Sequence, residues 1–357
     1  MLKKELPLLL AAVTAVVGFA VEHALIESGA VGVGSAFLVI VGVIVAISMR
    51  VAHHAEVLAE RFGEPYGTMI LTSSAVIVEV VMLAILMMNS EQPTLARDTV
   101  YAAVMIDING IIGIAAIIGG LRHGEQKYNL DASNSYIAML LVSLGISMFI
   151  PDFVPAESWQ MYSVFTIVIM LILYGVFLRI QTVEHRYFFR YQKLGAVVEP
   201  CAEHAATPIA AHVGLLVLSV VLIGVLAEIL SVLLEPAAQI FSIPAAIPAV
   251  MIALISAGPE ILTAMRAALR DEMQTVINIA LGASLATVLL TVPVIELIAL
   301  FSGTRIDMGI TSVQAAMLLL TLLAAMINLH DGETNVLEGV VLFALFATFV
   351  VLTFALV

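Results

Sequence analysis

Long apolar segments recur along the whole chain and are separated by short polar connections. Eleven of them, averaging about 20 residues, are long enough to cross the hydrocarbon core of a bilayer as α-helices. They are apolar all round rather than alternating, which excludes a transmembrane β-barrel. We therefore predict an all-α polytopic membrane protein with about 11 transmembrane helices, at 6–24, 31–50, 68–88, 99–121, 135–150, 161–180, 209–234, 243–268, 274–302, 309–328 and 338–356.

Composition agrees with this class and narrows the partners. Hydrophobic residues make up 62% of the 357 positions and charged residues 11%, which excludes a water-soluble protein. The formal net charge of −13 disfavours a nucleic-acid partner and favours cations. We expect membrane lipid, transported inorganic cations and protons as partners, and no bound cofactor. The sequence makes no prediction of oligomeric state.

The spacing of the segments predicts an internal repeat. The longest connection divides the chain near its middle, and each half then holds five spans after one leading helix. Because five is odd, the second half enters the membrane in the opposite sense, as in inverted-repeat transporters. We predict a leading transmembrane helix at 1–30, a first five-helix repeat at 31–180, a cytoplasmic linker at 181–208 and a second five-helix repeat at 209–357.

Basic residues predict the orientation. Only Arg97 and Arg305 of the 14 Lys and Arg residues fall on one side of the predicted membrane, and the other connections hold the rest. The positive-inside rule places the N-terminus in the cytoplasm and the C-terminus on the periplasmic or extracellular side. The run 6–24 follows Lys3 and Lys4 as a signal peptide would, but it lacks a small-residue cleavage site, so we interpret it as a retained span.

Five carboxylates fall inside the predicted spans, where a charged side chain costs at least about 2.5 kcal/mol. No Lys or Arg lies deep enough to neutralise them, so a mobile cation or a proton is the natural partner. They are Glu79, Asp107, Glu228, Glu260 and Glu296.

Two of these acids occupy matched places in the two halves. Glu79 and Glu260 lie in the second helix of their sets, 181 residues apart (260 − 79). Gly258-Pro259 precedes the second one, and we expect this pair to break its helix and free carbonyl oxygens for a cation. Ser256 lies one turn before Glu260.

Other polar residues are candidate ligands with an ordinary structural alternative. Ser284, Thr287 and Thr291 share a face of the ninth span, and Thr72, Ser73 and Ser74 precede Glu79, but hydroxyls at such positions also serve helix packing. His53 and His54, before the third span, and Glu296 are candidate proton relays. For the two histidines the alternative is a solvated amphipathic helix.

Both halves resemble a known family, the cation/proton antiporters of the calcium/cation exchanger superfamily, in particular its bacterial ChaA-type branch. Ala59-Glu60 through Gly63, Gly67 and Glu79 resembles the first family signature, which closes on a glutamate essential for transport. The second signature is similar to Gly258-Pro259-Glu260 followed by Gly282-Ala283-Ser284 and Val292-Pro293. Asp107 falls where related exchangers usually have asparagine.

The resemblance implies a secondary antiporter of the bacterial inner membrane that exports Ca²⁺ in exchange for protons, with Glu79 and Glu260 as shared cation and proton sites. A Na⁺ or K⁺/proton antiporter of the same fold is the alternative, and a cation channel is a more distant one. We do not expect an enzyme, because the sequence has no His-Glu-x-x-His zinc motif.

Overall fold

The computed structural model describes residues 5–27, 29–62, 66–89, 92–184, 188–189, 208–241, 244 and 246–355. Most of the predicted linker at 181–208 and the motif residues Gly63 to Pro65 lie outside these ranges. Nine of the described helical segments are long and apolar enough to span a membrane, and Leu6–Val21 and Ser312–Asn328 are shorter apolar helices. The prediction of an all-α protein with about 11 spans is confirmed.

The helices of the first half include three that are interrupted or extended by a wider, π-helical stretch, labelled η. The elements are α1 (Leu6–Glu27), α2 (Gly29–Phe62), α3 (Tyr66–Asn89), α4 (Leu95–Val104), η1 (Met105–Ile112), α5 (Gly113–His123), β1 (Gln126–Lys127), α6 (Leu130–Leu144), η2 (Gly145–Phe149), the 3₁₀ turns η3 (Ile150–Phe153) and η4 (Ala156–Ser158), α7 (Trp159–Arg179) and η5 (Ile180–Glu184).

A similar order of elements follows in the second half. Its elements are α8 (Ile209–Phe241), α9 (Ile247–Leu269), α10 (Met273–Ala286), η7 (Thr287–Thr291), α11 (Val292–Ser302), α12 (Ser312–Asn328), β2 (Glu333–Thr334) and α13 (Val336–Ala355). In each half a long helix comes first, a helix with an internal glutamate comes second, and a helix with a π-helical stretch comes third. This recurrence brings the two glutamate helices, α3 and α9, into contact.

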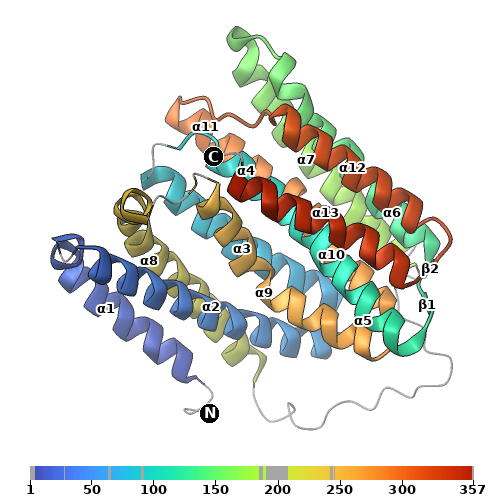
Figure 1. The fold of residues 1–357 in the computed structure, drawn as a ribbon, viewed down its shortest axis with the longest axis horizontal. Coiled ribbons are helices and arrows are strands. Elements are labelled where there is room, and N and C mark those ends of the chain that lie inside the picture. The colour runs from blue at the N-terminus through green and yellow to red at the C-terminus, as the bar shows by residue number, and fades with distance from the viewer. Residues whose placement is uncertain are drawn as a thin grey trace.

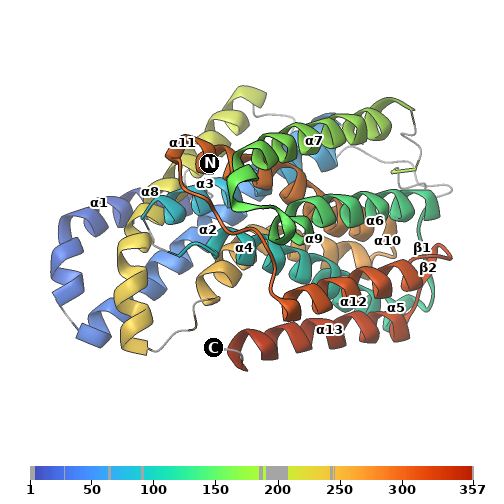
Figure 2. The same ribbon diagram turned by 90° about the horizontal axis from the view of Figure 1, so that it is seen from above.

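The two helices that carry Glu79 and Glu260, α3 and α9, lie in the middle of the bundle. Figure 1 shows α1, α2 and α8 together on one side of the bundle and α6, α7, α12 and α13 on the other, with α3, α9 and α10 between them. Figure 2 shows α12 and α13 side by side along one face. Every residue of η1 is buried, whereas large apolar side chains such as Phe354 and Val16 are exposed on the outer helices. The exposed apolar surface is what a lipid-facing exterior requires.

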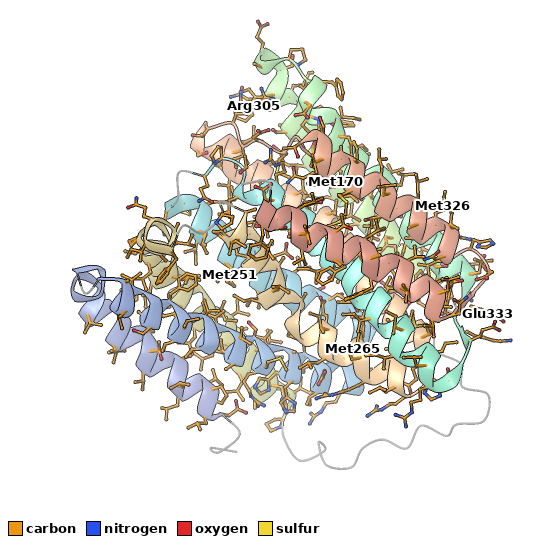
Figure 3. The ribbon with its side chains drawn as sticks, viewed as in Figure 1. Met170, Met251, Met265, Arg305, Met326 and Glu333 are labelled. Atoms are coloured by element: carbon orange, nitrogen blue, oxygen red, sulfur yellow. The ribbon has the colours of Figure 1, made fainter. Side chains whose placement is uncertain are left out.

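Helix ends follow local signals in the sequence. Asn129 accepts a hydrogen bond from the Ala132 N–H at 3.1 Å and begins α6, and Thr311 with Gln314 forms a capping box at the start of α12. Gly303 follows α11 in the left-handed conformation, with φ of 68°. These caps place the loops at the two ends of the bundle, where Figure 3 shows Arg305 and Glu333 at opposite ends.

A two-stranded contact joins the halves at one of those ends. Strand β1 pairs antiparallel with β2, and Tyr128 donates a hydrogen bond to the Glu333 carbonyl at 3.1 Å. Burial, followed by the nearby Asp331 and Glu338 carboxylates, raises the pKa of the Tyr128 phenol above its ordinary value. The folded junction therefore favours the protonated phenol, which donates this hydrogen bond.

Close helix contact holds α5 against α13. A Cβ atom on Gly113 would lie 2.9 Å from the Phe343 backbone nitrogen, and one on Gly339 would lie 2.7 Å from the Ile117 nitrogen. Only glycine permits this approach, which is a common way of packing helices in membranes. The contact fixes the segment that carries η1, and with it Asp107.

Candidate functional site

Three intramembrane carboxylates meet at one small cavity in the middle of the bundle. Glu79 of α3, Asp107 of η1 and Glu260 of α9 all line it, together with Ser256 and Thr287 among others, and its volume is about 10 Å³. The three acids are 2–3% exposed. A cavity of this volume holds about one water molecule or one ion. The structure thus brings together the two acids that the sequence paired and adds the third.

Hydroxyl groups from the second half donate to the acids of the first half. The Thr287 hydroxyl donates to Glu79 Oε2 at 2.8 Å, and the Ser284 hydroxyl donates to Asp107 Oδ2 at 2.9 Å. Each bond therefore crosses between the halves. Both hydroxyls were candidate ligands, and here they orient carboxylates whose remaining oxygens are available to a cation.

Oxygen atoms without partners face this region. Glu79 Oε1 and Glu260 Oε1 are buried and make no hydrogen bond with any described residue. Among the described residues, no Lys or Arg lines the cavity. Since buried carboxylate oxygens are normally paired, these two oxygens are available to a cation, a proton or an ordered water.

The carboxylates alone do not form a closed metal site in this conformation. Within the described ranges, no three His, Cys, Asp or Glu side chains are positioned to hold one metal ion together. A cation in the cavity would therefore need hydroxyl or carbonyl oxygens as well, or a closer approach of α3 and α9. Ca²⁺ takes six to eight oxygen ligands of these kinds, and Na⁺ and K⁺ are also hard cations that bind oxygen.

Two π-helical stretches carry the groups that face the glutamates. Asp107 lies in η1 and Thr287 begins η7. A π-helical turn widens the helix and shifts side chains relative to a regular α-helix, and such turns are frequent at functional sites. Neither stretch was predictable from the sequence, because neither contains proline or any other signal that separates it from an apolar α-helix.

The predicted helix break at Gly258-Pro259 is wrong. Helix α9 runs without interruption from Ile247 to Leu269, with Pro259 inside it. Proline removes one backbone donor, but neighbouring helices support a buried transmembrane helix through such a position. The Thr263 hydroxyl lies 3.0 Å from both the Pro259 carbonyl and Glu56 Oε1, either of which can accept its proton.

The hydroxyl residues before Glu79 do not lie at the cavity of the three acids. Thr72 lines a separate cavity with Tyr136 and Asn278, and Ser73 is half-buried; neither lines the cavity of the three acids. Ser256 does line that cavity, and its hydroxyl donates to the Ala253 carbonyl at 3.0 Å. Of the predicted hydroxyl ligands, Ser256 and Thr287 reach the cavity wall, and Ser284 acts through Asp107.

The candidate relay residues lie apart from the acids. Glu296 accepts a hydrogen bond from the Ser163 hydroxyl at 2.6 Å and lines another cavity, near Arg305. His54 is buried in α2, and its Nδ1 lies 3.1 Å from Nδ1 of His212 in α8. His53 is beside His54, with ring centroids 5.6 Å apart.

The structure therefore does not place His54 on a solvated face. Its partner His212 was missed, because 158 positions separate the two in sequence. Only the packing of α2 against α8 brings them together.

Comparison with known proteins identifies the family. A model of the family described as sodium/calcium exchanger protein matches residues 33–183 and 211–355. The protein y4hA of Sinorhizobium fredii is 38% identical over 84% of this chain and 83% of its own length. The sodium-potassium/proton antiporter ChaA of Escherichia coli is 32% identical over 89% of this chain and 88% of its own.

The solved structure of native YfkE has the same fold, with a TM-score of 0.75 at 17% identity, and the match covers 98% of this chain and 99% of that one. The family model covers well over half of this multi-pass membrane protein, in one segment from each half. The chain belongs to the sodium/calcium exchanger protein family.

Proposed function

We propose that this protein is a secondary antiporter that exchanges a cation for protons, with Glu79 and Glu260 as shared binding groups. The observation that carries the proposal is the single cavity onto which both glutamates open, each with an oxygen that lacks a partner among the described residues. The family and the antiporter ChaA support the same reading.

The exchange follows from the cost of buried charge. Carrying bare carboxylates across the hydrocarbon interior is unfavourable by several kcal/mol for each charge. The site therefore changes sides only when either cations or protons neutralise it. Because both compete for the same oxygens, loading one releases the other, and transport is coupled rather than a leak. The two five-helix repeats, 31–180 and 209–357, would supply inward- and outward-facing states by exchanging conformations.

Asp107 changes the charge balance of the site. Three carboxylates carry three negative charges when ionised, so one Ca²⁺ leaves one of them to be neutralised by a proton or by a monovalent cation. A single Na⁺ or K⁺ would leave two carboxylates to be neutralised. We propose Ca²⁺ as the exported ion, since divalent ions gain most from several carboxylates, and YfkE is described as a Ca²⁺/H⁺ antiporter.

Na⁺ or K⁺ is the second candidate. It is favoured by the 32% identity to ChaA, which is described as a sodium-potassium/proton antiporter. We also propose the bacterial inner membrane as the location, with the N-terminus in the cytoplasm and the C-terminus in the periplasm. The distribution of Lys and Arg supports this orientation.

Proton flux in everted membrane vesicles tests the proposal. Adding Ca²⁺, Na⁺ or K⁺ to energised vesicles should release accumulated protons, and Glu79→Gln or Glu260→Gln should abolish the response. Glu228→Gln is the control, since Glu228 accepts a hydrogen bond from Asn89 at 2.9 Å on an exposed part of the bundle. Full activity of both site variants would refute the proposal.

A further inference from the structure

A second small cavity adjoins the cation cavity through Glu260. It also has a volume of about 10 Å³ and lies between α2, α3 and α9. Ala75, Ser256 and Glu260 line both cavities, and Glu260 is the titratable residue among these three. The remaining wall of the second cavity is formed by Ser48, Val51, Ala52, Ser74, Val78 and Pro259.

Two buried oxygen atoms at this second cavity lack partners among the described residues. One is the Ser48 hydroxyl and the other is Glu260 Oε1, and each residue is 3% exposed. Ser74, in contrast, donates to the Ile70 carbonyl at 2.6 Å. Apolar side chains form most of the wall of this cavity, so Ser48 and Glu260 are the two groups there with an oxygen available to an ordered water. A water here would lie between Ser48 and Glu260, and Glu260 also lines the cavity of Glu79 and Asp107.

Helix α2 leads from this cavity to a buried cluster of titratable groups. Val51 lies one turn beyond Ser48, and His54 one turn beyond Val51, so Ser48 and His54 are about 9 Å apart along the axis. His54 Nδ1 lies 3.1 Å from His212 Nδ1, and His54 Nε2 lies 3.6 Å from Glu5 Oε2. The ionisable groups facing His54 are Glu5 at the start of α1, Arg50 and His53 of α2, and His212 of α8.

The contact between the two histidines holds one proton. Of two Nδ1 atoms 3.1 Å apart, one must donate and the other accept. Arg50 bonds the Glu5 carboxylate and holds it beside His54. The cluster can therefore take up a proton and pass it on.

We propose that protons move between Glu260 and the aqueous side at the His54 end of α2 by this side route, past Ser48 and the His54–His212 pair, rather than through the cavity that the cation uses. In the releasing direction, protonated Glu260 gives its proton to a water beside Ser48. That water passes a proton through further waters along the about 9 Å between Ser48 and His54 to the histidine cluster, which releases one to bulk water. The Glu260 carboxylate that remains is neutralised by the cation arriving from the other cavity, so charge and protons balance.

This inference rests on the proposed antiport, and one experiment separates the two. Purified protein in liposomes would be assayed for cation/proton exchange and, at equal pH on both sides, for exchange of isotopically labelled cation against the same cation. The second reaction needs the cation site but no proton transfer. Ser48→Val fills the cavity and removes its hydroxyl, and His54→Gln removes the titratable ring.

We expect both variants to lower cation/proton exchange by about a hundredfold, the lower end of the range for loss of a proton-transfer group, and to leave cation/cation exchange within about twofold. Ser219→Val is the matched control, since Ser219 is a buried serine of α8 whose hydroxyl donates to its own helix at Leu215. It should change neither reaction.

Unchanged cation/proton exchange in Ser48→Val and His54→Gln would overturn the side route. An equal fall in both reactions would also overturn it, because that result describes a structural role. Glu260→Gln should abolish both reactions; if it abolishes neither, the proposed antiport itself fails.

Discussion

Replacing Thr287 with valine tests whether this residue of the second half strengthens cation binding at Glu79 of the first half. The substitution keeps the shape of the side chain and removes the hydroxyl that donates to Glu79 Oε2 at 2.8 Å. A hydrogen bond to an ionised group contributes about 1.5–3 kcal/mol, and one between neutral groups about 0.5–1.5 kcal/mol. Thr287 therefore favours the ionised, cation-binding form of Glu79 over the protonated form by the difference, about 1–1.5 kcal/mol.

That difference corresponds to about 5–13-fold weaker apparent cation affinity at fixed pH. The assay is cation binding to purified protein by calorimetry, with Ca²⁺ and Na⁺ in separate titrations. Thr291→Val is the matched control. Thr291 lies in the same η7 stretch and is fully buried, but its hydroxyl has no partner among the described residues.

The variant Thr291→Val should bind cations as the unmodified protein does. Equal affinities for Thr287→Val and the unmodified protein would refute the coupling between Thr287 and Glu79. An equal loss in Thr291→Val would refute it too, because the effect would then come from packing rather than from the hydrogen bond.

Four further outcomes follow from the structure. Asp107→Asn should lower Ca²⁺ affinity by about tenfold and Na⁺ affinity less, because a divalent ion gains more from each carboxylate; parallel titrations with the two ions check this. Glu296→Gln should leave cation/proton exchange in vesicles within about twofold, because its cavity is separate from that of the three acids. Gly339→Val should destabilise the protein by about 1–3 kcal/mol through its clash with α5, measured by thermal unfolding in detergent, whereas Gly42→Ala, with open space around it, should not. The raised pKa of Tyr128 adds stability that is present below about pH 10 and is lost as the pH rises further, so Tyr128→Phe should lessen the fall in melting temperature in alkaline solution.

The helical architecture was predictable because a helix that crosses a bilayer needs about 20 consecutive, predominantly apolar residues. Apolar runs give the spans, and the matched places of Glu79 and Glu260 predicted that they would meet. Both line one cavity. The helix that carries His54 runs to Phe62, beyond the predicted end at residue 50, because a transmembrane helix continues through polar residues where another helix packs on it.

The finer geometry of the site was not predictable in the same way. The π-helical stretches at Asp107 and Thr287 depend on how neighbouring helices pack, and composition does not record that. The Gly258-Pro259 pair predicted a helix break, but α9 is continuous because neighbouring helices pack around it. The pairing of His54 with His212 required the crossing of α2 and α8.

Proton release on cation binding shows whether cations and protons share Glu79 and Glu260, and its measurement needs neither a membrane nor a gradient. Ca²⁺, and separately Na⁺, would be added to purified protein in weakly buffered detergent while a pH indicator records released protons. We expect proton release by the unmodified protein and none by the double variant Glu79→Gln, Glu260→Gln. Cation binding by the unmodified protein without any proton release would contradict this expectation.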